Sequence, residues 1–248
     1  MWWQIVKKEI KENYMYISVF VGLLMILSLY ASFRKAWKPE EILFLSFVLS
    51  GLGGIILVFY GIYRGFSSFK REKERNTLEF LMSLPIDGQD VIPSKFLAFI
   101  VEAFVSALVT YFLSLVPALV SISFVKAIKL YDFLRLAKFV LLLDCSLFLV
   151  SLYAYAVFNL FEIFSLSFKL KGFITKAVFF SLFIYLTFRL FHILKGLLKF
   201  IPQESYEILF LGEVLNFGAD YRGLAAGALL TIFYLGVSVV LYSKRMEV

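Results

Sequence analysis

Long uncharged stretches recur along this 248-residue chain and limit what it can fold into. Residues 15–33 and residues 42–63 contain no Asp, Glu, Lys or Arg. Further apolar runs cover about 96–125, 139–161, a stretch that begins near 177, and 224–242. A helix needs ~20 mostly apolar residues to cross the hydrocarbon core, so each run is long enough to span a membrane. The pattern predicts an all-α polytopic membrane protein with six transmembrane helices.

Composition supports the same class, because 61% of the residues are hydrophobic and only 17% are charged. The mean hydropathy of +0.87 exceeds what a water-soluble domain hides in one core. Six spans with short connections use up the chain, so we expect one transmembrane domain, 1–248. The net charge of +7 comes from Lys and Arg that flank apolar runs. We therefore expect contact with the lipid bilayer and its headgroups, and none with nucleic acid.

The first residues, 1–14, form an amphipathic segment. Trp2 and Trp3 lie on one side of a helix through this segment, while Lys7 and Lys8 lie elsewhere. Aromatic and cationic side chains of this kind favour the boundary between lipid and water. The sequence therefore predicts an N-terminal interfacial helix before the first span.

Small residues recur at helical spacing in the second span, at Ser46, Ser50, Gly54 and Gly61. A stripe of this kind lets another helix approach closely. The same stripe could line a substrate path, and the sequence leaves both interpretations open.

Between the second and third spans, residues 69–84 read FKREKERNTLEFLMSL, a charge-dense start followed by a short helical pattern. Asn76 can cap a helix, with Glu79 three residues on as its reciprocal partner, and Pro85 stops the helix. Leu78, Leu81 and Met82 follow at i, i+3 and i+4, which gives one apolar face over two turns. Such a helix is too short to span a membrane and is suited to docking. A charge run of this kind can also be an ordinary solvated loop.

This segment resembles the cytoplasmic motif E-R-E-x-G-T-L-E-x-L-L-x-x-P of permease subunits of type 2 ATP-binding-cassette (ABC) exporters. The sequence has Asn76 where that family usually has Gly, and both residues tolerate the backbone of a helix entry. The resemblance continues to Lys95 and weakly to Lys8-Glu9 near the N-terminus. It assigns ATPase coupling to Glu72, Glu74, Asn76, Thr77, Leu78, Glu79, Leu81, Met82, Leu84 and Pro85.

The resemblance implies that this chain forms the translocation path together with a second permease, most simply in a homodimer, and that a separate cytoplasmic ATPase supplies the energy. Residues 64–95 would then be the cytoplasmic coupling segment that contains the short coupling helix. The chain itself would be non-catalytic and hold no cofactor or metal, because ATP and Mg²⁺ would be bound by the ATPase. It has no Walker A loop, and its single Cys145 and single His192 cannot form a zinc or haem site.

Four polar residues in or beside the spans could line a substrate path or carry proton chemistry: Glu102, Asp144, Arg189 and His192. An intramembrane enzyme would need Glu102, Asp144 and His192 in one cavity. A secondary transporter or channel without an ATPase is a further alternative, although no inverted repeat is evident. A non-transporting subunit that keeps only the coupling motif is a third.

The flanking charges suggest an orientation. Lys and Arg are slightly more frequent beside the segments that lie inside if the N-terminus is cytoplasmic. We expect an integral, multi-pass protein of the cytoplasmic (plasma) membrane with both termini in the cytoplasm. Residues 194–222 would form an extracytoplasmic segment that begins with an amphipathic cationic extension of the fifth span.

Overall fold

The structure is a computed structural model that describes residues 2–33, 39–74, 88–120, 130–168, 173–210 and 213–246. Its elements, in chain order, are α1 (Trp2–Phe33), α2 (Pro39–Glu74), α4 (Gly88–Val120), α5 (Leu130–Ser167), α6 (Phe173–Leu197), β1 (Glu204–Phe210), β2 (Glu213–Ala219) and α7 (Tyr221–Met246). Within the described residues, 6 helices are long and apolar enough to cross a membrane. The predicted polytopic α-helical architecture with six spans is confirmed.

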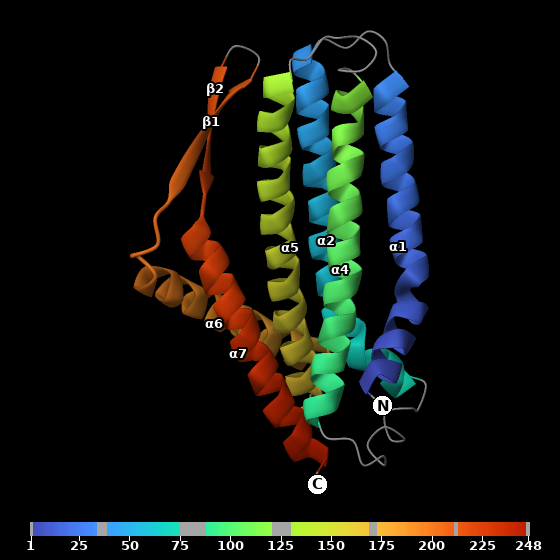
Figure 1. Cartoon of the computed structure of the whole chain (residues 1–248). Helices are drawn as coiled ribbons and strands as arrows, with labels where there is room; N and C mark the ends of the chain where they lie inside the picture. Colours follow the sequence, from blue (N-terminus) through green and yellow to red (C-terminus); the bar gives the residue numbers. More distant parts are fainter. Residues whose placement is uncertain are drawn as a thin grey trace.

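Helices α1, α2, α4 and α5 stand side by side as an upright bundle (Figure 1). Helix α7 leans against the bundle, and α6 runs at a steep angle to the other helices (Figure 1). The two termini lie at the same end of the molecule, where α2 ends and α4 begins (Figure 1). The hairpin of β1 and β2 lies toward the opposite end.

Residues 1–14 differ from the expectation of a separate interfacial helix. From Trp2 onward they form the first turns of α1, a single helix of 32 residues that continues into the first span. The chain has no Pro or Gly before Gly22, so nothing interrupts the helix at this point. At 1.5 Å per residue α1 is ~48 Å long, longer than the ~30 Å hydrocarbon core.

The small residues of α2 bring it into close contact with α5. A Cβ atom added at Gly54 would lie 2.1 Å from Leu147, and one added at Gly61 would lie 2.6 Å from the carbonyl oxygen of Ser151. Gly65 is equally tight against Phe158. The stripe predicted from the sequence therefore serves helix packing.

Pro117 lies inside α4 and has no N–H to donate to the carbonyl of Leu113, four residues earlier. The hydroxyl of Ser28 on α1 donates to that carbonyl at 2.6 Å. A neighbouring helix thus replaces the missing backbone bond, which is how Pro is tolerated within a membrane span.

Phenylalanine rings attach the first half of α6 to α5 and α2. Phe180 of α6 lies 4.9 Å from Phe161 of α5 and 6.0 Å from Phe66 of α2, measured between ring centroids. These tilted and edge-on arrangements are the favourable ones for aromatic pairs. The second half of α6 has mostly exposed side chains.

An antiparallel hairpin joins α6 to α7, with Glu204 paired to Ala219 and Phe210 paired to Glu213. It lies within residues 194–222, where the sequence pattern predicts no strands, and corrects the all-α expectation for this segment. Asp220 follows the second strand and caps α7, because its carboxylate accepts the Gly223 N–H at 3.1 Å.

Candidate functional site

The predicted coupling residues lie mainly outside the described part of the chain. Glu72 and Glu74 are in the last turn of α2, where only the backbone is described. The others fall within 75–87, outside the described residues: Asn76, Thr77, Leu78, Glu79, Leu81, Met82, Leu84 and Pro85. Their role in coupling stays a prediction. What the structure does describe is how the two helices that flank them, α2 and α4, are joined to α1.

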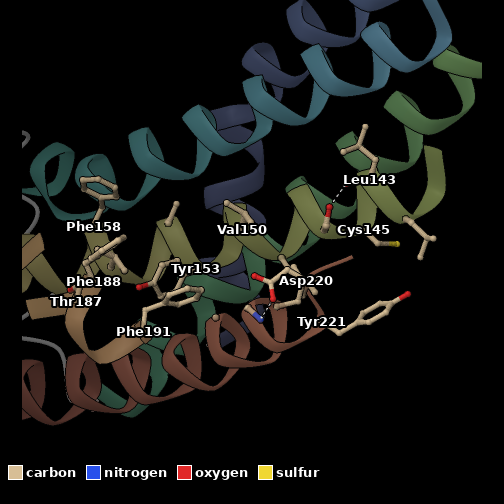
Figure 2. A pocket seen from close by; sticks show the side chains of 18 of the residues that line it. Leu143, Cys145, Val150, Tyr153, Phe158, Thr187, Phe188, Phe191, Asp220 and Tyr221 are labelled. Carbon is tan, nitrogen blue, oxygen red and sulfur yellow. Dashed lines mark hydrogen bonds between the residues drawn. The ribbon is translucent and has the colours of Figure 1, made fainter. Parts of the chain in front are cut away.

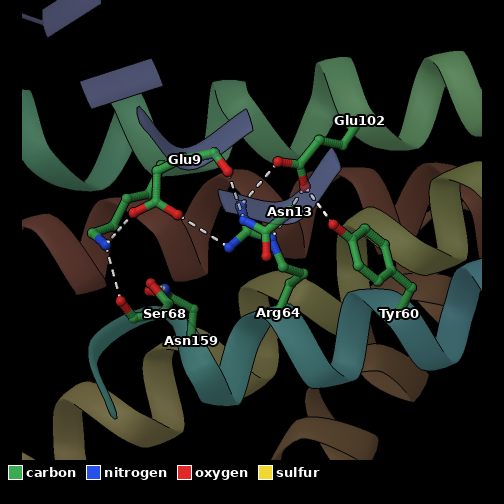
Figure 3. Close-up of polar contacts among 8 residues, drawn as sticks. Glu9, Asn13, Tyr60, Arg64, Ser68, Glu102 and Asn159 are labelled. Atoms are coloured by element: carbon green, nitrogen blue, oxygen red, sulfur yellow. Dashed lines mark hydrogen bonds and ion pairs between the residues drawn. The ribbon is translucent and has the colours of Figure 1, made fainter. Parts of the chain in front are cut away.

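A buried polar cluster joins these three helices, with Arg64 of α2 at its centre (Figure 3). The guanidinium donates to both carboxylate oxygens of Glu102 on α4, at 3.1 and 3.2 Å. It also donates to Glu9 of α1 at 3.1 Å. The hydroxyl of Tyr60 donates to Glu102 at 2.7 Å. Arg64 and Glu102 are only 2% and 1% exposed, so this arrangement lies in the interior of the bundle.

Lys95 of α4 completes the cluster. Its ammonium donates to Glu9 at 2.7 Å and to the backbone carbonyl of Ser68 at 2.9 Å. It also lies 5.2 Å from the centroid of the Phe69 ring, a cation–π contact. The hydroxyl of Ser68 accepts from Asn159 of α5 at 3.1 Å, so all four upright helices contribute.

The cluster is balanced in charge, since the carboxylates of Glu9 and Glu102 face the cations of Arg64 and Lys95. An isolated charge at this depth would be strongly destabilising, whereas a paired and hydrogen-bonded set is tolerated. Removing any one of these four charged side chains would leave an uncompensated charge. The cluster therefore fixes how α1, α2 and α4 sit against one another. We call Glu9, Tyr60, Arg64, Lys95 and Glu102 the ion cluster.

Helical spacing explains why these side chains meet. On α2, Tyr60 and Arg64 are four residues apart and share a face. On α4, Lys95 and Glu102 are seven residues apart, which again places them on one face. Glu9 on α1 lies opposite both. Side chains at these spacings project from three separate helices into one interior space.

The four intramembrane candidates are not brought together. Glu102 belongs to the ion cluster, whereas Asp144 of α5 accepts from Ser50 of α2 at 2.8 Å. Ser50 precedes Arg64 by 14 residues, which is ~21 Å along α2. The second oxygen of Asp144 is buried and has no hydrogen-bond partner among the described residues. This separation gives no support to an intramembrane enzyme that uses Glu102 and Asp144 in one cavity.

Arg189 and His192 lie on the exposed face of α6. The Arg189 guanidinium donates to the Tyr185 hydroxyl at 2.9 Å, and His192 contacts the backbone carbonyl of Phe188 at 3.2 Å. Both contacts are made within one helix. Within the described residues, no group of three or more His, Cys, Asp and Glu could hold a metal ion.

The ion cluster as a unit cannot be predicted from the sequence. In the sequence, Arg64 directly follows the uncharged run 42–63, and Glu9 lies in the amphipathic segment 1–14, so neither is marked as a buried charge. Lys95 entered only through the family resemblance. The one usable signal is the position of Arg64. It lies four residues after Tyr60, on the same face of the helix, where the apolar pattern would place another apolar residue.

Comparison with known families identifies the class of protein. The family model for ABC-2 family transporter proteins matches residues 3–245. The match covers nearly the whole chain, so the chain belongs to this family. No curated protein and no solved structure gives a match. The resemblance drawn from residues 72–95 is confirmed, and the protein is an integral, multi-pass permease of the ABC transporter class.

Proposed function

We propose that the chain is the membrane-spanning permease subunit of an ABC exporter, driven by a separate cytoplasmic ATPase. Family membership supports a transport role, and the family as a whole implies an ATPase partner. Export as the direction rests on the motif in residues 72–85. ATP and Mg²⁺ would bind to the ATPase, and residues 75–87 would contact its surface.

The ion cluster is the observation that carries this proposal. The segment 75–87 connects α2 to α4, and both helices are joined to α1 by buried ion pairs close to that connection. Arg64 lies ten residues before the end of α2, which is ~15 Å. Lys95 lies seven residues after α4 begins, which is ~10 Å. A displacement of the segment would therefore move α1, α2 and α4 as one body.

The shared position of the termini supports the proposed topology. An even number of spans returns the chain to its starting side, and Figure 1 has both termini at the end where α2 meets α4. If the ATPase is cytoplasmic, this end faces the cytoplasm and the hairpin lies outside. We place the protein in the cytoplasmic membrane on this basis.

A homodimer is part of the proposal, because most soluble oligomers are built from identical chains, most often as two-fold dimers, and we extend this to the permease. Large apolar side chains are exposed along α6, among them Ile174, Val178 and Ile193, at 77%, 65% and 61%. Lipid or a second copy can cover such a surface.

Copurification tests the proposal. The tagged permease would be expressed with an ATPase that carries Walker A and B motifs, then purified in detergent and weighed by native mass spectrometry. We expect a particle with two permeases and two ATPases that hydrolyses ATP. A strictly monomeric permease that retains no ATPase would contradict the proposal.

A further inference from the structure

Asp144 of α5 is buried in the bundle with only part of its hydrogen-bonding capacity used. The residue is 4% exposed. Its Oδ1 accepts from the hydroxyl of Ser50 on α2 at 2.8 Å, whereas its Oδ2 has no partner among the described residues. Ser50 lies eight residues into the uncharged run 42–63, or ~12 Å, which places the pair within a membrane span. An acidic residue at such a position is a candidate functional group.

The face of α2 that meets Asp144 carries a second hydroxyl. Ser46 precedes Ser50 by four residues and therefore lies on the same face of the helix. It is fully buried, and its Oγ also has no hydrogen-bond partner among the described residues. Residues 42–63 contain no Lys or Arg. This stretch of α2 therefore offers Asp144 hydroxyl groups and no counter-ion.

The charged groups of the surrounding helices lie far from Asp144 along the helix axes. Within α5 the nearest on the same side of the chain is Lys138, six residues or ~9 Å earlier. In α2 the nearest to Ser50 is Glu41, nine residues or ~14 Å earlier. In α4 the nearest is Glu102, which belongs to the ion cluster, ~21 Å further along α2. In the ion cluster two carboxylates face two cations, whereas Asp144 faces none within the described part of the chain.

The other face of α5 borders a groove of about 940 Å³ between α5, α6 and the start of α7. Side chains such as Leu143, Cys145 and Tyr153 line it on α5 (Figure 2). Asp144 does not line this groove, although both of its neighbours in the chain do. Asp220 is the one charged residue among the described residues of the lining, and it therefore lies on the opposite side of α5 from the contact with Ser50.

Burial of Asp144 favours the neutral acid. An ionised carboxylate here would have one hydroxyl donor and no counter-ion, which is strongly unfavourable. The neutral acid keeps the hydrogen bond from Ser50 to Oδ1 and carries its proton on the oxygen that otherwise has no partner. The helices are also closely packed nearby, because a Cβ atom added at Gly54 would lie 2.1 Å from Leu147. A proton is the one cation that needs no additional space.

We propose that Asp144 is a proton-binding site between α2 and α5. It holds a proton on Oδ2 while the two helices are packed together, and it releases the proton to water when they separate. Binding forms the O–H bond and leaves the carboxyl group neutral, whereas release breaks this bond and leaves a carboxylate that water solvates. Since the packed state binds the proton more tightly, a higher pH favours separation of α2 from α5. The site does not rest on the proposed contact with an ATPase.

Infrared spectroscopy of the full chain in vesicles tests the protonation. A neutral carboxylic acid has a C=O stretch that is well separated from the bands of a carboxylate. We expect an acid band in wild type at neutral pH that is lost in Asp144→Asn and kept in Asp90→Asn, a control at an exposed carboxyl group of α4. Ser50→Ala should keep the band and move it to higher wavenumber, because the C=O oxygen loses its hydrogen bond.

Thermal unfolding in detergent over a series of pH values tests the linkage to packing. Asn has nearly the shape of the neutral acid and does not ionise. Asp144→Asn should therefore match wild type in mild acid and have the higher melting temperature in mild alkali, whereas Asp90→Asn should follow wild type throughout. If Asp144→Asn does not fold, the acid band of wild type and its shift in Ser50→Ala decide the question.

Three results would overturn the proposal. The first is the absence of an acid band that responds to Asp144→Asn or Ser50→Ala. The second is a melting temperature of Asp144→Asn that is lower at every pH, with the same pH dependence as wild type, since the carboxyl group would then be only structural. The third is stabilisation of wild type by Na⁺ or K⁺ at constant pH that Asp144→Asn loses. This result would identify a metal cation, rather than a proton, as the occupant.

Discussion

The guanidinium of Arg64 binds the carboxylate of Glu102 through two nitrogen atoms, at 3.1 and 3.2 Å, and joins α2 to α4 in the interior of the bundle. A two-point contact between planar groups fixes orientation as well as distance. The two helices it joins are those that enter and leave residues 75–87. We propose that this pair passes a displacement of that segment on to both helices.

Arg64→Met should strongly destabilise the protein, because Glu9 and Glu102 would then share only Lys95. Removing one partner of a buried ion pair costs ~3–5 kcal/mol. The double variant Arg64→Met, Glu102→Met leaves the balanced pair of Glu9 and Lys95, and should recover most of the loss. Thermal unfolding in detergent measures both variants. Equal melting temperatures for wild type and Arg64→Met would show that the pair does not hold the helices together.

Gly61→Ala should also be destabilising, because the new Cβ would lie 2.6 Å from the backbone oxygen of Ser151. A backbone atom cannot rotate away, so α2 and α5 must separate, at a cost of ~1–3 kcal/mol for overpacking. Gly51→Ala, on the same helix with nothing within 4 Å, is the matched control and should be neutral or stabilising. A similar melting temperature for both variants would contradict the close approach of the helices.

The contact of Asp220 with Lys195 should weaken in acid. Partial burial raises the pKa of Asp220, but the hydrogen bonds from Lys195 and from the Gly223 N–H outweigh this effect and hold the pKa below its ordinary value of 3.8. The contribution to stability is therefore complete above pH ~4 and is lost as the pH falls through the lowered pKa. Because the pair is partly exposed, we expect the loss to be ~0–1 kcal/mol.

Hydrogen exchange at the start of α7 measures this effect as a function of pH. Asp220→Asn keeps a good helix cap but removes the charge, so the acid dependence should disappear while protection near Gly223 persists. An unchanged acid dependence in Asp220→Asn would assign it to another group.

The spans could be predicted from the sequence because each depends on a local property, an uncharged run of sufficient length. The ion cluster could not, because Arg64 and Glu9 are 55 residues apart and only the packing of three helices brings them together. A charge at the end of an apolar run has the same local pattern whether it faces water or a buried partner. Helix α2 continues beyond Arg64 to Glu74. Arg64 therefore lies inside the helix rather than at its end, and faces the interior of the bundle.

The hairpin of β1 and β2 is hard to predict from the sequence for a different reason. The segment 204–219 is short, and its three glutamates are typical of a solvated connection: Glu204, Glu207 and Glu213. The available signal was Gly212 between two runs that contain Tyr206, Ile208, Val214 and Phe217, which is typical of strands joined by a turn. Pairing between the two strands, rather than burial, satisfies their backbone groups.

The proposed topology can be tested with single cysteines in intact cells on a Cys145→Ser background. Gln203→Cys, in the exposed connection after α6, should react with an impermeant maleimide added outside, and Asp87→Cys should react only after permeabilisation. The pattern follows from a cytoplasmic coupling segment and an external hairpin. Reaction of Asp87→Cys from outside would invert the topology and remove the basis for ATPase contact.

Contact between residues 75–87 and the ATPase is the central expectation for this protein, and one substitution tests it directly. The sequence predicts that Leu78, Leu81 and Met82 form the apolar face of a docking helix. A charge at Leu81 would have to be desolvated against the ATPase, at a cost of several kcal/mol when unpaired. Lys70→Ala, at an exposed side chain of α2, should cost no more than ~1 kcal/mol and is the control.

The measurement is ATP hydrolysis by the reconstituted complex, with copurification of the ATPase followed in parallel. We predict that Leu81→Asp loses the ATPase or its stimulated hydrolysis while it still inserts into the membrane, and that Lys70→Ala behaves as wild type. Wild-type hydrolysis and copurification in Leu81→Asp, with loss of both in Lys70→Ala, would contradict the assignment of this segment as the coupling element.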